Sequence, residues 1–331
     1  MIMPKMPLLL TLVIFLIMNS GCTGEGHKLN LPDTKDNLLL VSHLKNPLLT
    51  VIDLNEQEII RELELPFIVS DMVKINENEI IISSQQTDSL YSLRLDDHIL
   101  EPFVETGKGI NELIFIEKTG TVYAANSLKN ELVKVSIQDD IIVNKKNTEE
   151  HPSSLTYNPD RDEIYLANVY DHSIQRFDGD SLELIDTLTI VDRPNGLLYY
   201  DQHLIAGGHG ATEELNRDVF IFSLSEKETV HQLTTGLMPI DFVKTDDSER
   251  LYAISHGSHE VYEIDPETFS VLRKIEVGFN PYSSLYHSGT LFISTLDGHT
   301  VTLIETEDFQ IYKEIAVAPG PHTMILLEGI K

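Results

Sequence analysis

A short apolar segment recurs seven times along the chain, at intervals of about 42 residues. After a polar turn, each copy is followed by a second alternating run. The copies are LLLVSH (38–43), EIIISS (79–84), TVYAAN (121–126), EIYLAN (163–168), HLIAGG (203–208), RLYAIS (250–255) and TLFIST (290–295). Such a period indicates a repeat architecture, in which one supersecondary unit is built over and over.

Each repeat contains four such runs, which predicts four short strands. A third run, such as VLRKIEV (271–277), precedes a turn marked by Pro or Gly, and a fourth apolar run follows that turn. Four antiparallel strands in about 42 residues are typical of a β-propeller blade. We therefore predict an all-β, seven-bladed β-propeller with four antiparallel strands per blade. From the axis outward, the strands of a blade are called A, B, C and D.

The ends of the chain predict how the ring closes. The first repeat begins with its B strand, at Leu38, and the chain ends with PHTMILLEG (321–329), an A strand with no B strand after it. We expect Thr323–Leu327 to pair with Leu38–Ser42 in the first blade. This pairing hides two sheet edges, which would otherwise be open to association with other chains.

Two stretches carry a family resemblance. EIYLANVYDHSIQRFDGDSLELIDTLTIVDRPNGL (163–197) and RLYAISHGSHEVYEIDPETFSVLRKIEVGFNP (250–281) resemble the repeat of YVTN-type propellers. That family consists of seven-bladed and often exported proteins, and the resemblance extends over residues 35–331. It implies a fold but no activity, because propellers serve as enzymes, electron-transfer proteins and binding scaffolds.

The N-terminus has the features of an export signal. Lys5 precedes an apolar run, Leu8–Met18, and the segment ends in Ser20, Gly21 and Cys22, which resembles a bacterial lipobox. We predict a lipoprotein signal peptide over 1–21, an acylated Cys22 with a flexible tether over 22–36, and the propeller over 37–331. The mature protein would be anchored in a bacterial cell membrane, on its extracytoplasmic face.

The charge balance limits the class of partner. Asp and Glu total 53 against 24 Lys and Arg, giving a formal net charge of −29. A chain this acidic repels phosphate backbones, so nucleic-acid binding is excluded, while cations and basic groups are attracted. With one cysteine in the chain, the propeller has no internal disulfide. We expect a monomer.

The histidines divide into two groups by their place in the blade. His172, His259 and His299 lie two residues before the first apolar residue of a C strand, where other blades carry residues such as Asn130. Asn stabilises turns through its side chain, so these histidines are expected to be turn residues. A second group lies where A strands start and B strands end. Those ends meet on one face, the top face, which carries the D–A and B–C turns; the A–B and C–D turns form the bottom face.

The residues expected at the top mouth of the central channel form a candidate ligand-binding set. They are His43, His151, Arg193, Asn195, His209, His256, Asn280, Tyr282 and His322. His43 and His322 belong to the same blade, so a close pair is expected. Deeper in the channel, Asp71, Glu112 and Asp241 replace the small residues of other A strands. Carboxylates facing a channel suit a hard cation, and a divalent cation is the one cofactor suggested.

The sequence is compatible with three functions. A complete scaffold without a recognised catalytic motif favours a non-catalytic propeller that binds a small molecule or a protein through its top mouth. One alternative is a hydrolase of the lactonase or esterase type, assisted by a cation. Another is a metal or redox accessory protein that uses His43, His256 and His322.

Overall fold

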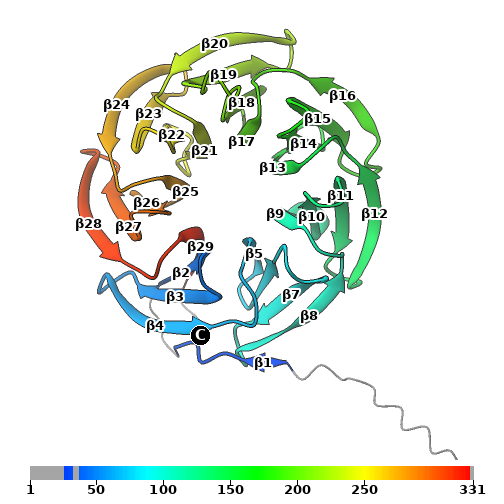
Figure 1. The fold of residues 1–331 in the computed structure, drawn as a ribbon, viewed down its shortest axis with the longest axis vertical. Helices are drawn as coiled ribbons and strands as arrows, with labels where there is room; N and C mark the ends of the chain where they lie inside the picture. The colour runs from blue at the N-terminus through cyan, green and yellow to red at the C-terminus, as the bar shows by residue number, and fades with distance from the viewer. Residues whose placement is uncertain (1–25, 33–36, 329–331) are drawn as a thin grey trace, which may run out of the picture.

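The computed structural model describes residues 26–32 and 37–328, and in them the chain forms a seven-bladed β-propeller (Figure 1). Seven antiparallel sheets stand around a central axis, and each contributes four strands to the ring. The predicted fold class is therefore confirmed. The only helical element among the described residues is a 3-10 turn, η1 (Glu117–Thr119).

The blades follow one another around the ring, each with strands A to D from the axis outward (Figure 1). Blade 1 consists of β29 (Pro321–Leu327), β2 (Leu38–His43), β3 (Leu48–Asp53) and β4 (Glu58–Glu64). Blade 2 consists of β5 (Asp71–Asn76), β6 (Glu79–Ser83), β7 (Ser89–Arg94) and β8 (Ile99–Glu105). Blade 3 consists of β9 (Ile110–Ile116), β10 (Thr121–Asn126), β11 (Glu131–Ser136) and β12 (Ile141–Asn147).

The other four blades repeat this order. Blade 4 consists of β13 (Pro152–Asn158), β14 (Glu163–Asn168), β15 (Ser173–Asp178) and β16 (Leu184–Leu188). Blade 5 consists of β17 (Pro194–Tyr200), β18 (His203–Gly208), β19 (Asp218–Ser223) and β20 (Glu228–Thr234). Blade 6 consists of β21 (Pro239–Lys244), β22 (Leu251–Ser255), β23 (Glu260–Asp265) and β24 (Ser270–Glu276). Blade 7 consists of β25 (Pro281–His287), β26 (Thr290–Thr295), β27 (Thr300–Glu305) and β28 (Gln310–Ala316).

The burial of each strand follows from its place in the blade. The B strands β2, β10 and β14 are buried at every residue, because both faces of a blade pack against its neighbours. The D strands form the rim and alternate between exposed and half-buried residues, as β12 does. The cores therefore lie between blades: Tyr123 of blade 3, for example, packs with Leu155 and Leu166 of blade 4.

Ring closure in blade 1 occurs as the sequence predicts. β29 pairs antiparallel with β2, with Leu38 opposite Leu327 and Val41 opposite Met324. A register irregularity follows, after which His43 lies opposite Pro321. The last strand of the chain thus becomes the innermost strand of the first blade, and it locks the two ends of the ring together.

The segment predicted as a flexible tether packs on the propeller in its described part. β1 (His27–Lys28) adds a fifth strand to the outer edge of blade 2, with His27 opposite Leu100. Leu29 and Leu31 follow and are buried in the core shared by blades 1 and 2. Burying these two leucines removes apolar surface from water, which explains why the segment packs on the propeller and does not remain free. The tether prediction is corrected for residues 26–32.

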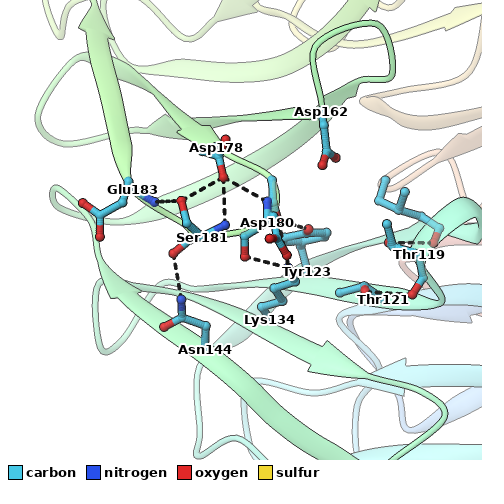
Figure 2. A network of polar contacts seen from close by, with 12 residues as sticks. Thr119, Thr121, Tyr123, Lys134, Asn144, Asp162, Asp178, Asp180, Ser181 and Glu183 are labelled. Atoms are coloured by element: carbon cyan, nitrogen blue, oxygen red, sulfur yellow. Dashed lines mark hydrogen bonds and ion pairs between the residues drawn. The ribbon is translucent and has the colours of Figure 1, made fainter.

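The blades are also joined on the bottom face, and Figure 2 shows the junction between blades 3 and 4. The buried ammonium of Lys134, on β11, donates to the carbonyls of Gly179 at 3.0 Å and Asp180 at 2.7 Å in the C–D turn of blade 4. The Tyr123 hydroxyl donates to the same Gly179 carbonyl. Asp178 organises that turn by accepting from the backbone N–H of Ser181 at 2.8 Å. One cation thus satisfies carbonyls that the tight turn cannot pair internally.

Cys22 and the apolar run Leu8–Met18 lie outside the described residues. In the part of the chain that the structure does describe, no helix is long and apolar enough to cross a membrane.

Candidate functional site

Two successive residues of each blade, at or near the start of its A strand, line the top of the central channel. The upper set, which we call the mouth ring, is Ser70, Asn111, Ser153, Asn195, Ile240, Tyr282 and His322. The next set, the carboxylate ring, is Asp71, Glu112, Ser154, Gly196, Asp241, Ser283 and Thr323. All fourteen line one cavity of about 340 Å³, which is within the usual size of small-molecule sites.

Small residues are required where the innermost strands crowd together. Gly196, with φ of +88°, lies in the carboxylate ring on β17. A Cβ atom there would lie 2.2 Å from the carbonyl oxygen of Ile240 on β21. The absence of a side chain therefore lets the A strands of blades 5 and 6 approach closely.

The three carboxylates of the ring connect neighbouring blades. Each accepts a hydrogen bond from a backbone N–H on the A strand of the next blade along the chain. The pairs are Asp71 with Leu113 at 2.8 Å, Glu112 with Leu155 at 2.8 Å, and Asp241 with Ser284 at 2.6 Å. Asp71 also accepts from the Thr323 hydroxyl of blade 1 at 2.9 Å. These bonds give the carboxylates a structural role that the sequence did not reveal.

Burial makes the three carboxyl groups reluctant to ionise. Removal from water raises the pKa of Asp71 to about 6 and the pKa of Asp241 to about 7. The pKa of Glu112 lies well above its ordinary value, first through burial and then through the nearby charges of Asp71 and Asp241. The ring is therefore only partly ionised near neutral pH.

The ring is not a shared metal site in this structure. Among residues 26–32 and 37–328, no three His, Cys, Asp or Glu side chains gather in a way that could hold a metal ion. Both oxygens of Asp71 are hydrogen-bonded within the protein: one accepts from Met72 and Thr323, the other from Leu113. The sequence placed the three carboxylates in the channel but could not show these backbone donors.

Three of the nine residues predicted at the mouth line the cavity: Asn195, Tyr282 and His322. Tyr282 connects histidines from two other blades, since its ring centroid lies 4.6 Å from that of His322 and 5.8 Å from that of His256. Burial lowers the pKa of His322 to about 4, and its Nδ1 atom is buried without a hydrogen-bond partner. His322 is thus a neutral imidazole at the mouth.

His43 does not line the cavity beside His322. Its ring is buried, with Nε2 2.8 Å from the hydroxyl of Thr50 on β3. Burial lowers the pKa of His43 to about 4. The expected pairing of the two histidines relied on their sharing a blade, but the side chain of His43 is directed toward the C strand, away from the axis.

The other predicted mouth residues belong to the turns around the cavity. The left-handed backbone of His151, Arg193 and Asn280 marks them as turn residues. His209 lies 3.5 Å from Asn195 and has a pKa lowered to about 4, first by burial and then by the charge of Arg193. They surround the mouth without entering the cavity.

The prediction that His172, His259 and His299 are turn residues is confirmed. All three have positive φ, and each Nδ1 accepts a backbone N–H from the turn that leads into the next blade. The donors are Arg193 at 3.1 Å, Asn280 at 3.0 Å and Gly320 at 3.3 Å. Asn130 makes the equivalent bond to His151 at 3.0 Å. These histidines thus replace asparagine in a repeated turn.

Exposed apolar side chains distinguish the two faces of the ring. Outside the D strands, every large apolar side chain that is exposed among the described residues lies on the top face: Leu128, Tyr170, Leu215 and Phe279. Leu128 and Phe279 are 65% and 67% exposed. The bottom turns are acidic instead, with pairs such as Asp96–Asp97, Asp139–Asp140 and Glu307–Asp308. In the sequence, no pattern distinguishes the four exposed apolar residues from their neighbours.

A longer B–C turn in blade 5 was also missed. Residues 209–217 connect β18 to β19, whereas the equivalent turn in blade 3 is residues 127–130. Beneath this turn lies a second top-face cavity of about 400 Å³, bounded by Asp192, Leu215 and Phe220 among others. The wider spacing between HLIAGG (203–208) and RLYAIS (250–255) could have indicated this longer turn.

Comparisons with known proteins agree on the fold. A structure of a functionally unknown protein from Desulfotomaculum acetoxidans superposes with a TM-score of 0.74 at 10% identity, covering 89% of this chain and 100% of that one. AztD from Citrobacter koseri gives 0.62 at 10% identity, covering 90% and 99%. The dihydro-heme d1 dehydrogenase NirN, in complex with DHE, gives 0.61 at 12% identity, covering 92% and 78%.

At these identities the likeness establishes the propeller fold and nothing finer. No family model matches the chain. No curated protein matches it either. The YVTN-type family therefore stays a prediction.

Proposed function

We propose that the protein is a non-catalytic binding propeller that takes a small ligand into the cavity at the top of its channel. The observation that carries this proposal is the cavity itself. Two successive residues from each blade line a space of about 340 Å³. Ligand sites are usually preformed hollows in which a few polar groups converge among apolar side chains.

The geometry supports binding better than hydrolysis or metal handling. A cation-assisted hydrolase would need its carboxylates gathered around one ion, but the described residues contain no group of three His, Cys, Asp or Glu side chains that could hold one. A metal or redox role for His43, His256 and His322 would need them together. His43 is directed to Thr50 instead.

A thermal-shift screen tests the proposal. Small amines, alcohols, carboxylates and sugars would be added to the wild type, to Ser283→Leu, which fills the cavity, and to Ser225→Leu, a control on the bottom face. Compounds that raise the melting temperature of the wild type and of the control, but not of Ser283→Leu, would support it. Equal shifts in all three proteins, or none in any, would overturn it.

A protein partner on the same face is the second candidate function. The observation in its favour is the restriction of exposed turn leucine and aromatic side chains to the top, with Leu128 and Phe279 foremost. Exposed apolar side chains of this kind mark interaction surfaces when they gather on one face.

Export and anchoring are part of the same proposal. Cys22 would carry the lipid, and the protein would be a monomer held at the extracytoplasmic face of a bacterial membrane. Gly26 is the first described residue, and four residues extend at most about 14 Å, so the anchor would hold the rim of blade 2 near the bilayer. Replacement Cys22→Ala should move the protein from the membrane fraction to the soluble fraction. Unchanged fractionation would contradict the anchor.

A further inference from the structure

Resting on the proposed function, we infer that the ligand of the top cavity is a small organic ammonium ion with a short apolar tail. The lining of the cavity offers both kinds of surface that such a molecule requires. Polar side chains and carboxyl groups lie near the start of the A strands, and Leu113, Leu155, Leu197, Leu198 and Phe242 follow them in sequence and also contribute to the lining.

The polar half of the cavity offers acceptors that no protein group uses. Both hydrogen bonds that Glu112 accepts go to Oε1, from Leu155 at 2.8 Å and Ser154 at 3.5 Å, which leaves Oε2 available. The Nδ1 atom of His322 and the hydroxyl oxygen of Ser153 are buried without partners, and Ser153 is only 5% exposed. Buried polar atoms in this state are costly unless a ligand or water bonds them.

The charge of the cavity selects a cation. No Lys or Arg is among the residues that line it, so an anion would find no countercharge there. The one basic group of the lining, His322, is neutral at physiological pH because burial lowers its pKa to about 4. A neutral imidazole accepts a hydrogen bond and does not repel a positive ligand.

An organic cation fits this cavity better than a metal ion does. Mg²⁺ and Ca²⁺ require six or more oxygen ligands at fixed distances. The described residues provide no group of three His, Cys, Asp or Glu side chains that could hold a metal ion. An ammonium group needs fewer acceptors, and the ring of Tyr282 can add cation–π attraction. The apolar lining then receives the tail, whose burial adds to the affinity.

Binding of a cation should release protons from the cavity. The titratable groups that face it are Asp71, Glu112, Asp241, Tyr282 and His322. Burial raises the pKa of Asp71 to about 6 and of Asp241 to about 7, and that of Glu112 well above its ordinary value. A positive ligand favours the ionised carboxylates, so the affinity should rise as the pH increases from acidic values to above neutrality.

Isothermal titration calorimetry on the full chain with butylamine, 1-butanol and butyrate tests the inference. The three probes share a tail and differ in charge. We expect butylamine to bind at least about tenfold more tightly than either of the others, since a hydrogen bond to a charged group is worth a factor of that order. Titration in buffers of different ionisation enthalpy should show release of about one proton per amine bound.

The variant Glu112→Gln identifies the site. The amide oxygen keeps the acceptor for Leu155, so the blades stay joined, but the carboxyl group that would ionise beside the ligand is lost. Butylamine affinity should fall about tenfold in Glu112→Gln and stay unchanged in Glu226→Gln, which makes the same substitution on the bottom face. Equal loss in both variants would overturn the inference, as would equal binding of 1-butanol or tighter binding of butyrate.

Two outcomes separate this inference from the proposed function. If butylamine fails to bind while other compounds protect the wild type and not Ser283→Leu, the cavity binds ligands but the ammonium assignment is wrong. A lysine side chain of a partner carries the same ammonium group, and Nα-acetyl-lysine amide represents it. Tighter binding of that compound than of butylamine would support the ammonium site and assign its natural ligand to a protein.

Discussion

His43 makes the stability of the first blade depend on pH. Its side chain is 0% exposed, and its Nε2 atom meets the Thr50 hydroxyl at 2.8 Å, while Nδ1 has no partner. Burial lowers the pKa of His43 from 6.5 to about 4. His43 lies opposite Pro321 of the closing strand. Its protonation should therefore destabilise the strand pair that closes the ring.

The sign and the size follow from that shift. A folded-state pKa below the unfolded value means that the unfolded chain binds the proton more readily, so stability is lost as the pH falls below about 6.5. Between about pH 8 and pH 5 the loss amounts to about 2 kcal/mol for this one histidine, at 1.36 kcal/mol per pKa unit. This is a sizeable share of a typical stability of about 5–15 kcal/mol.

The variant His43→Gln removes the titration and keeps a polar partner for Thr50. The free energy of unfolding, measured by urea denaturation at both pH values, should fall by about 2 kcal/mol more in the wild type than in the variant. The carboxyl groups act in the opposite direction, because their raised pKa values make acidification favourable. They are present in both proteins and cancel in the comparison. A difference between the two proteins that stays constant within about 0.5 kcal/mol would refute the reasoning.

Three further predictions concern how the ring is held. Deletion of Pro321–Lys331 removes the A strand of blade 1, and we expect loss of the cooperative melting transition in calorimetry; an unchanged transition would contradict closure by β29. Replacement Lys134→Met leaves the Asp180 carbonyl without its donor and the Gly179 carbonyl with the Tyr123 hydroxyl alone, so urea unfolding should show a loss of about 1–3 kcal/mol, whereas Lys146→Met on the rim should change little. Replacement Leu31→Ser should lower the stability by about 2 kcal/mol in the same assay, and a neutral effect would show that the N-terminal segment is not packed.

The repeat made most of the fold predictable. The B strands recur in the sequence at intervals of about 42 residues, so they could be located before the structure was known. Because the first repeat lacks an A strand, the last strand of the chain could be identified as its pairing partner. His259 could be assigned to a turn because Asn130 holds the equivalent position in another blade. Because the blades repeat, equivalent positions could be compared within one chain, as positions are otherwise compared between related proteins.

The candidate site was only partly predictable. Position in a strand predicted that Asp71 and His322 line the channel, but it did not show that the His43 side chain contacts Thr50 on the C strand. Small polar residues such as Ser153 are common in strands and turns, so the sequence did not indicate that they line the cavity. Their place in the lining is evident only in the structure. The packing of Leu31 was missed because a two-residue strand carries no periodicity.

The most direct measurement of the central claim is methyl NMR on leucine-labelled protein during titration with a bound compound. Binding in the top cavity predicts shifts at Leu113, Leu155 and Leu197, which line it, with no change at Leu215 beside the second cavity. Shifts confined to Leu215, or spread over the rim leucines, would contradict the assignment of the channel mouth as the binding site.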